Sequence, residues 1–405
     1  MPDPALAARL NAHIANERCK QLLIDIVRVP SPQTDLFEAE PQLKIFIATA
    51  VEPRLRAMGF HIRHDAMGNL IGEIGEDATG RSLMLITNAM NQPQATMGNA
   101  YAGDVIDARP HGLPGEAVLG KGASEQKGPM ASVFAALEAV MAEGLPIRGR
   151  LIVLCCTSGE TGRHDAIRSV VEGAGVRAEM AVLGGTGLKI TLGNRGRIDV
   201  HATVHGAPCH SSRPHDGCNA ITGAIEVIRR VIAGFDPGVP HPALGPRTLT
   251  ANHIRSLPEA THTVQDCCAI TFDRRLLPGD DPQAAFAEIK ALAMQVDGQP
   301  DPASGKPWRV EVELGAFMHP NLVAPDAAVV TALQSAARQM VGHEMVTWYA
   351  PSAFDQGYLN HMGIATVNFG AGEHMFAHTD LDMASVDRVT EGARVLAGLI
   401  ADRVC

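Results

Sequence analysis

Two carboxylates and one imidazole, on Glu125, Glu160 and His378, stand in short polar segments that adjoin apolar, strand-like runs. Glu160 lies in CCTSGETGRH (155–164), and Glu125 lies in the glycine-rich stretch LGKGASEQKG (119–128), ahead of a helical pattern. Because ligands of α/β proteins bind beyond the carboxyl ends of strands, we expect the three side chains to converge. An O,O,N donor set suits Mn, Fe or Zn and leaves positions open for water and substrate.

Each of the three residues also fits a structural role when it is considered alone. Glu125 stands near a predicted helix N-terminus, where an anion is favoured. Glu160 could be a turn residue in contact with water, and His378 could be a histidine whose ring nitrogens are hydrogen-bonded within the fold. A fourth polar segment, residues 87–91, follows the apolar run 83–86 and is expected at the same edge of the sheet. The metal hypothesis therefore depends on the elements that bring these segments together.

The pattern of elements predicts an α/β fold with a mainly parallel sheet, interrupted by a smaller α+β domain. Wholly apolar runs such as 83–86 and 150–156 are typical of strands covered on both faces, and they alternate with helical stretches. From residue 197 the order of elements becomes βαββαβ, which favours a ferredoxin-like split unit. We therefore predict one domain formed by residues 1–196 and 316–405, and a second formed by residues 197–315.

Composition excludes several classes of partner. The formal net charge is −10 and no basic cluster offsets it, which argues against nucleic acid and anionic membranes. No apolar run approaches the roughly 18 residues of a membrane span, and the N-terminus lacks the pattern of a signal peptide. The eight cysteines include no CxxC pair. We expect a reduced, cytoplasmic protein.

An ordered series of short motifs runs along nearly the whole chain. The stretches are VPS (29–31), GN (68–69), GKGASEQKG (120–128), ETG (160–162), GAPCHSSRP (206–214), GCNAI (217–221), DRR (273–275) and AH (377–378). This series resembles the co-catalytic zinc amidohydrolases that include aminoacylase, carboxypeptidase G and succinyl-diaminopimelate desuccinylase. The resemblance implies a metal-binding α/β domain with an inserted α+β lid that dimerises.

The departures from the family pattern fall on one of its two metal sites. Where the resemblance implies a His-x-Asp, this chain has Asn88 and Met90, so the histidine ligand and its orienting carboxylate are both replaced. Gly159 stands where the family has its general base. The stretch 184–186, Gly-Gly-Thr, stands where the family has a further acidic ligand.

The second metal site keeps all of its matches. Glu125 stands where the family has its bridging aspartate, and Glu160 and His378 match the other two ligands. This selective loss implies a site for one divalent transition metal per chain, Mn or Zn.

The lid motifs also match. His210 resembles a histidine that reaches into the partner subunit's active site and stabilises developing negative charge. Arg275 and Asn219 match positions that bind a substrate carboxylate, although Asn219 fits a turn-shaping role equally well. Asp355 lies in a stretch similar to a family segment of mostly structural role.

Without a glutamate at position 159, ordinary peptide hydrolysis should be poor, since losing such a base costs roughly 10²–10⁴-fold. The favoured prediction is a mononuclear, metal-dependent hydrolase of a non-peptide C–N bond in a small carboxylate-bearing substrate. The retained site also resembles that of the nitroanthranilate aminohydrolase type. This resemblance implies the sharpest form of the prediction, hydrolytic deamination of an aromatic amine such as 5-nitroanthranilate, in which hydroxyl replaces the amino group and ammonia leaves.

Two alternatives stay open. The first is a single-metal amidase or deacylase of N-acyl amino acids, with His164, Asp165 or Glu373 as the replacement base. The second is a non-catalytic binding protein on a hydrolase fold.

Overall fold

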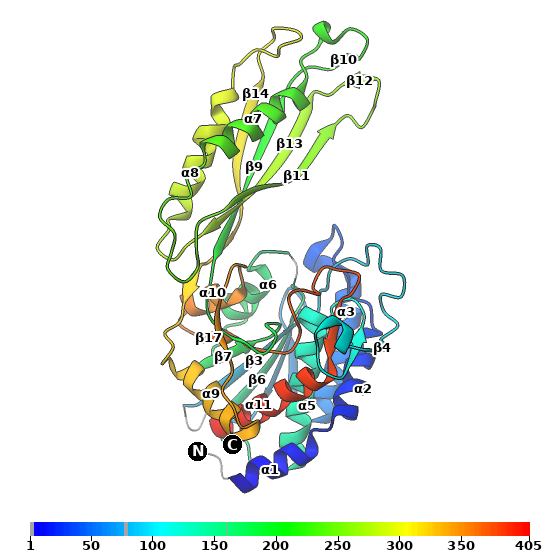
Figure 1. Ribbon diagram of the computed structural model, residues 1–405, viewed down its shortest axis with the longest axis vertical. Coiled ribbons are helices and arrows are strands. Elements are labelled where there is room, and N and C mark those ends of the chain that lie inside the picture. Colours follow the sequence, from blue (N-terminus) through cyan, green and yellow to red (C-terminus); the bar gives the residue numbers. More distant parts are fainter. Residues whose placement is uncertain (1–3, 77–79, 160) are drawn as a thin grey trace. The chain divides into compact units, whose positions relative to one another are not determined.

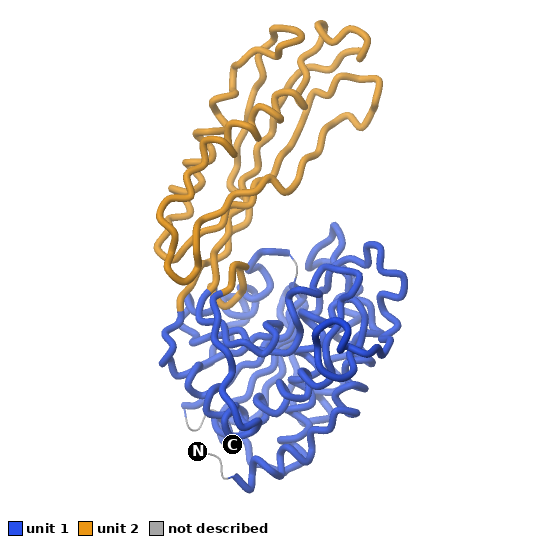
Figure 2. Tube along the Cα trace, in the orientation of Figure 1, with its two compact units in different colours: residues 1–193, 323–349, 358–405 blue, residues 194–322, 350–357 orange. Residues whose placement is uncertain are grey.

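The computed structural model describes residues 4–76, 80–159 and 161–405. Contacts divide the chain into two compact units, shown in separate colours in Figure 2. Unit 1 comprises residues 1–193, 323–349 and 358–405, and unit 2 comprises residues 194–322 and 350–357.

Unit 1 is built on a six-stranded sheet in the order β1-β2-β6-β3-β7-β17. Its four strands β6, β3, β7 and β17 are parallel neighbours, and β1 and β2 add antiparallel pairs at one edge. The predicted mainly parallel sheet is therefore confirmed. The strands are β1 (His61–His64), β2 (Leu70–Ile74), β3 (Ser82–Asn88), β6 (Arg150–Cys156), β7 (Met180–Leu183) and β17 (Ala365–Asn368).

Both faces of this sheet are covered, which explains the unbroken apolar runs. On β3, Leu83 and Leu85 belong to one hydrophobic cluster, whereas Met84 and Ile86 belong to another on the opposite face. The larger cluster lies beneath α2 (Asn16–Val27), α5 (Gly128–Ala142) and α11 (Val386–Val404), which contact one another (Figure 1). Alternation of side chains along a strand requires apolar residues at every position when both faces are buried.

The segment of Glu125 departs from the expectation that it follows a strand of the main sheet. It follows β5 (Glu116–Leu119), which belongs to a separate antiparallel sheet with β4 (Asp104–Asp107) and β18 (Met383–Ser385). A π-helical turn, Ala123–Lys127, then leads into α5. The small sheet thus pairs β5 with β18, the strand that follows His378, and brings the two segments together.

The other elements of unit 1 and of the unit boundary complete the description. They are α1 (Pro4–His13), the helical run formed by α3 (Pro41–Phe46), a π-turn (Ile47–Val51) and α4 (Glu52–Ala57), α6 (Asp165–Arg168), β8 (Ile190–Asn194), β15 (Asn321–Leu322), α9 (Ala328–Met340), β16 (Thr347–Ala350) and α10 (Asp355–His361).

Unit 2 is an antiparallel sheet in the order β11-β13-β9-β14 with two helices on one face (Figure 1). The chain order is β9 (Gly196–His205), α7 (Ala220–Gly234), β11 (Leu249–Leu257), β13 (Cys267–Leu276), α8 (Pro282–Ala293) and β14 (Arg309–Met318), with the short pair β10 (Cys209–His210) and β12 (Thr263–Val264). This is the predicted βαββαβ order. Ile198, Val200, Ala202 and Val204 alternate along β9 into the core beneath the helices.

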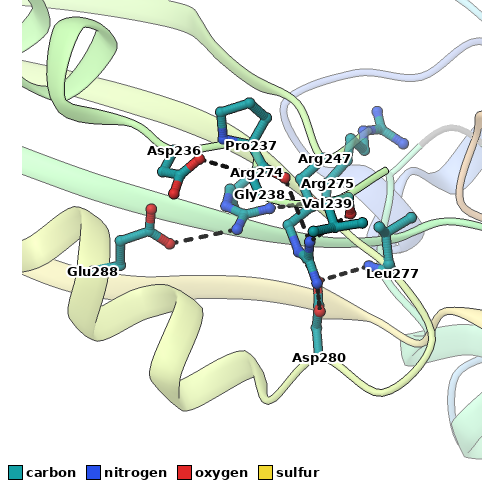
Figure 3. Close-up of polar contacts among 10 residues, drawn as sticks. All are labelled: Asp236, Pro237, Gly238, Val239, Arg247, Arg274, Arg275, Leu277, Asp280 and Glu288. Carbon is teal, nitrogen blue, oxygen red and sulfur yellow. Dashed lines mark hydrogen bonds and ion pairs between the residues drawn. The ribbon is translucent and has the colours of Figure 1, made fainter. Parts of the chain in front are cut away.

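Hydrogen bonds between charged side chains join the loop that precedes β11 to the turn that follows β13 (Figure 3). Arg247 donates from Nε to Asp280 Oδ2 at 2.9 Å, and the backbone N–H of Leu277 donates to the same oxygen at 2.9 Å. Burial would raise the pKa of Asp280, but the hydrogen bonds from Arg247 and Leu277 outweigh it and the pKa is lowered. The neighbouring Arg274 is buried and pairs with Glu288 at 3.4 Å.

We predict that Asp280→Asn lowers the free energy of unfolding at neutral pH by about 1.5–3 kcal/mol, the range for hydrogen bonds to charged groups. Because the folded pKa is depressed, the pair stabilises the fold above the unfolded pKa of about 4 and ceases to do so as pH falls through the folded pKa. Urea unfolding at several pH values measures the difference in the free energy of unfolding between wild type and variant. This difference should become smaller as the pH is lowered. Asp236→Asn, on an exposed turn, is the control; a difference that stays constant with pH would contradict the assignment.

Candidate metal centre

Glu125 lies between two histidines of one loop. The Nε2 atom of His378 is 3.1 Å from one carboxylate oxygen of Glu125, and the Nδ1 atom of His374 is 3.7 Å from the other. The hydrogen bond to Glu125 raises the pKa of His378, whereas burial lowers the pKa of His374. Glu125 and His378, two of the three predicted ligands, are therefore brought together by the fold.

His378 adopts a left-handed backbone conformation, with φ of 62°. Non-glycine residues rarely take this conformation, and it persists only where the surrounding structure enforces it. Strain of this kind clusters at functional sites. At His378 it accompanies the imidazole's approach to Glu125.

A buried carboxylate, Asp382, fastens the loop that carries Glu125. It accepts hydrogen bonds from the backbone N–H of Gly122 at 2.7 Å, the backbone N–H of Ser124 at 2.9 Å and the Ser124 hydroxyl at 2.8 Å. The Nζ of Lys121 also donates to the Thr379 carbonyl at 2.7 Å. Burial raises the pKa of Asp382, and the hydrogen bonds from Ser124 and Gly122 oppose that rise. The segments 120–125 and 378–382 thus form one hydrogen-bonded unit.

Backbone closes the positions where the family resemblance implies a general base and an acidic ligand. A Cβ atom at Gly159 would lie 2.4 Å from the Met90 carbonyl oxygen, and one at Gly185 would lie 2.7 Å from the Glu125 carbonyl oxygen. A Cβ at Gly184 would lie 2.2 Å from the Pro129 ring. Side chains at these positions would require the backbone to move, so the absent groups have no space left for them.

Asn88 ends β3 at the place where the resemblance implies a histidine. Its Oδ1 atom is buried and has no hydrogen-bond partner among the residues that the structure describes. Met90, at the place of the orienting aspartate, is fully buried in the core. The end of β3 therefore offers one unsatisfied carbonyl acceptor.

The third predicted ligand, Glu160, lies outside the described residues. Within the described ranges, no three His, Cys, Asp or Glu side chains form a cluster that could hold a metal ion by themselves. The chemistry of Glu125 and His378 nevertheless fits a divalent transition metal, because a carboxylate and an imidazole converge at hydrogen-bond distance on a strained backbone. The single-metal hypothesis therefore needs Glu160 as a further donor.

His374 was missed by reasoning from the sequence. It lies four residues before His378, and the pair shares Glu125. The spacing His-x₃-His next to a predicted strand end was the available signal. The short distances make His374 either an additional ligand candidate or an orienting group for Glu125.

The lid candidates belong to unit 2 and already have intramolecular partners there. Arg275 forms a two-pronged pair with Asp273 at 2.8 and 3.0 Å. Asn219 caps α7 by accepting from the Ile221 N–H at 3.0 Å, which is the turn-shaping role left open by the sequence. His210 is exposed, and its Nδ1 accepts from the Ser212 N–H at 3.2 Å.

Each of the three candidate replacement bases has a neighbouring side chain of its own. His164 is buried with its ring centroid 5.2 Å from that of Tyr358. Asp165 lies 3.5 Å from Arg163, and Glu373 lies 3.3 Å from Arg388. Asp355 begins α10.

Comparisons with known proteins agree with this architecture. The model of the peptidase dimerisation domain matches residues 192–299. A protein of Escherichia coli K12 named YgeY, itself uncharacterized, is 28% identical over 280 residues, which cover 67% of this chain and 64% of YgeY. The succinyl-diaminopimelate desuccinylase of Corynebacterium glutamicum is 28% identical over 230 residues, 56% of this chain and 58% of the enzyme. The matches therefore span less than two thirds of these relatives.

Solved structures share the fold along nearly the whole chain. Human carnosine dipeptidase 1 superposes with a TM-score of 0.80 at 16% identity, covering 99% of both chains. A metallo-carboxypeptidase of Sulfolobus solfataricus gives a TM-score of 0.73 at 15% identity, covering 94% of this chain and 97% of the other. None of the helices that the structure describes has the length and apolar character needed to cross a membrane.

We predict that Asp382→Asn weakens metal binding about 10–100-fold, because the loop of Glu125 loses its carboxylate anchor. Competition with a chelating dye measures the metal dissociation constant, and circular dichroism checks the fold. The matched control is Asp380→Asn in the same loop, because Asp380 accepts a hydrogen bond from the hydroxyl of the exposed Thr96 at 2.6 Å. Equal metal affinity in wild type and Asp382→Asn protein would refute the anchoring role.

Proposed function

From its resemblance to the metallopeptidase and aminoacylase family, which the comparisons confirm, we propose that the chain is a metal-dependent hydrolase with one metal per chain. The proposed reaction is hydrolysis of a non-peptide C–N bond in a small carboxylate-bearing substrate. Its best form is hydrolytic deamination of an aromatic amine such as 5-nitroanthranilate. The proposed ligands are Glu125, Glu160 and His378, and the metal is Mn or Zn.

The observation that carries this proposal is the closed backbone around Gly159 and Gly185. Gly159 has no side chain to act as a general base. The Met90 carbonyl oxygen stands 2.4 Å from where a Cβ would lie, so the space for such a side chain is filled. A two-metal peptidase needs that base to take a proton from water and deliver it to the amine. A substrate whose own ring accepts negative charge needs less of this assistance.

Two groups of the chain suit an aromatic amine. The buried Oδ1 of Asn88 offers an acceptor for an N–H of the substrate's amino group. His210, exposed on unit 2, is proposed to donate to developing negative charge in the partner subunit's site. When bound, the metal supplies a Lewis acid that activates water near neutral pH.

A second candidate function is hydrolysis of an N-acyl amino acid by the same single-metal site. The desuccinylase relatives favour it, because their names denote removal of an acyl group from an amine. Against it stands the engagement of His164, Asp165 and Glu373, each with a partner of its own.

We predict that the metal-loaded protein releases ammonia from 5-nitroanthranilate or a related aminobenzoate and hydrolyses N-acetyl and N-succinyl amino acids poorly. Glu160→Gln and His378→Ala should abolish turnover and lose the metal together. His343→Ala, whose ring pairs with Glu391 at 2.9 Å on another surface, is the control and should keep both. A coupled assay measures ammonia release, and elemental analysis measures the metal content of each variant. Turnover of N-acyl amino acids without ammonia release from aminobenzoates would overturn the preferred reaction in favour of the second candidate function.

The protein is further proposed to be a homodimer joined through unit 2. The match to the peptidase dimerisation domain supports this, as do apolar side chains exposed on α7 and on the edge strand β11. Ile225 is 56% exposed, Ile232 47% and Ile254 52%. Contacts of α7 with β11 make these elements neighbours.

Replacing Ile225 and Ile232 together by Asp should convert the dimer to monomer at micromolar concentration, because two charges would have to be buried on association. Sedimentation velocity measures the mass. Ile45→Asp on unit 1, where Ile45 is 50% exposed, is the control and should leave the mass unchanged. A wild-type monomer, or a double variant that remains dimeric, would contradict the proposed interface.

A further inference from the structure

An aromatic side chain stands next to the histidine that the sequence reasoning missed, and a lysine stands over that aromatic ring. The ring of Trp348 lies with its centroid 5.7 Å from that of His374, and its Nε1 donates to the Thr191 hydroxyl at 2.9 Å. The ammonium of Lys189 stands over the same indole, 5.4 Å from the ring centroid. Thus Glu125, His374, Trp348 and Lys189 follow one another in a chain of contacts within unit 1.

The indole holds the lysine in place. An ammonium over the face of a tryptophan is attracted by the ring quadrupole, and tryptophan is the best aromatic partner for this contact. Lys189 is exposed, so its charge stays in water, while the half-buried Trp348 is fixed by its hydrogen bond to Thr191. A charge positioned in this way loses less freedom when it binds an anion than an unconstrained surface lysine does.

Two other cationic side chains near the predicted ligands already have partners within the chain. Lys121 is buried and donates to the Thr379 carbonyl at 2.7 Å, and Arg388 pairs with Glu373 at 3.3 Å. Lys189 forms no ion pair with any carboxylate in the described ranges.

We propose that Lys189, positioned by Trp348, binds the ring carboxylate of an aromatic substrate whose amino group reacts at the centre of Glu125. This assignment rests on the proposed function and sharpens its substrate class to aromatic carboxylates. It also moves carboxylate recognition from Arg275, whose guanidinium fork is filled by Asp273, to a residue of unit 1. In this role Lys189 touches the substrate, and Trp348 is a positioning residue.

Binding of benzoate and of its neutral counterpart, benzamide, tests the proposal without turnover. Equilibrium dialysis on the metal-free protein removes direct metal coordination as a source of affinity. Wild type should bind benzoate about tenfold or more tightly than benzamide, the difference expected of one charge-assisted hydrogen bond. Lys189→Gln should erase that preference, Lys189→Arg should keep much of it, and Trp348→Leu should reduce it.

Two variants serve as controls. Lys290 stands 5.7 Å from the Phe286 ring in unit 2, so Lys290→Gln removes a similar lysine–aromatic contact away from unit 1 and should leave the preference intact. Arg275→Gln should also leave it intact. The proposal is overturned if wild type shows no preference for benzoate, if Lys189→Gln keeps the preference, or if Arg275→Gln removes it.

The same measurements separate this proposal from the proposed function. A protein that prefers benzoate through Lys189 but releases no ammonia from any aminobenzoate would refute the function and leave the binding site standing. A protein that deaminates aminobenzoates with an unchanged KM in Lys189→Gln would refute the binding site and leave the function standing.

Discussion

The carboxylate of Asp382 is the contact on which the geometry of the candidate site depends. Its oxygens accept three hydrogen bonds from Gly122 and Ser124, one residue before Glu125. The backbone of the same residue accepts from the Gly120 N–H at 2.8 Å, and β18 follows at once to pair with β5. A single buried aspartate thus brings a loop from residues 120–125 against a loop from residues 378–382, and Glu125 meets His378 as a result.

Close backbone packing imposes the second constraint. Gly159, Gly184 and Gly185 let Met90, Pro129 and the Glu125 carbonyl approach to distances that a Cβ would forbid. Interiors are packed at the density of organic crystals, so a side chain that is lost from such a place leaves space that neighbours fill. The proposed single-metal function accounts for both features together, because a site for one metal needs neither the general base nor the further acidic ligand.

Much of the fold could be predicted from the sequence, because its signals were strong and local. The runs at 83–86 and 150–156 are apolar at every position, and only a sheet covered on both faces uses such strands. The βαββαβ order of unit 2 could likewise be predicted from the alternation of apolar and polar residues in its strands and from the length of its helical stretches. The small sheet that contains β5 could not be predicted, since the sequence of a four-residue strand does not indicate which strand it pairs with.

The site was predictable only in part, and for a physical reason. Glu125 and His378 could be proposed because family motifs carry them, and the fold brings them together. His374, Trp348 and Lys189 come from three separate segments that tertiary contacts alone unite, so no local pattern announces them. Arg275 and Asn219 were chosen by motif. Their partners within unit 2 are local: Asp273 lies two residues from Arg275 on β13, and Ile221 lies two residues from Asn219 at the start of α7.

The number of metal ions bound per chain tests the central claim most directly. Metal-free protein is titrated with Mn²⁺ and with Zn²⁺ by isothermal calorimetry, and elemental analysis of the dialysed product counts the ions retained. The account predicts one tightly bound ion per chain, abolished in Glu160→Gln. Two tightly bound ions per chain, or none with either metal, would contradict it.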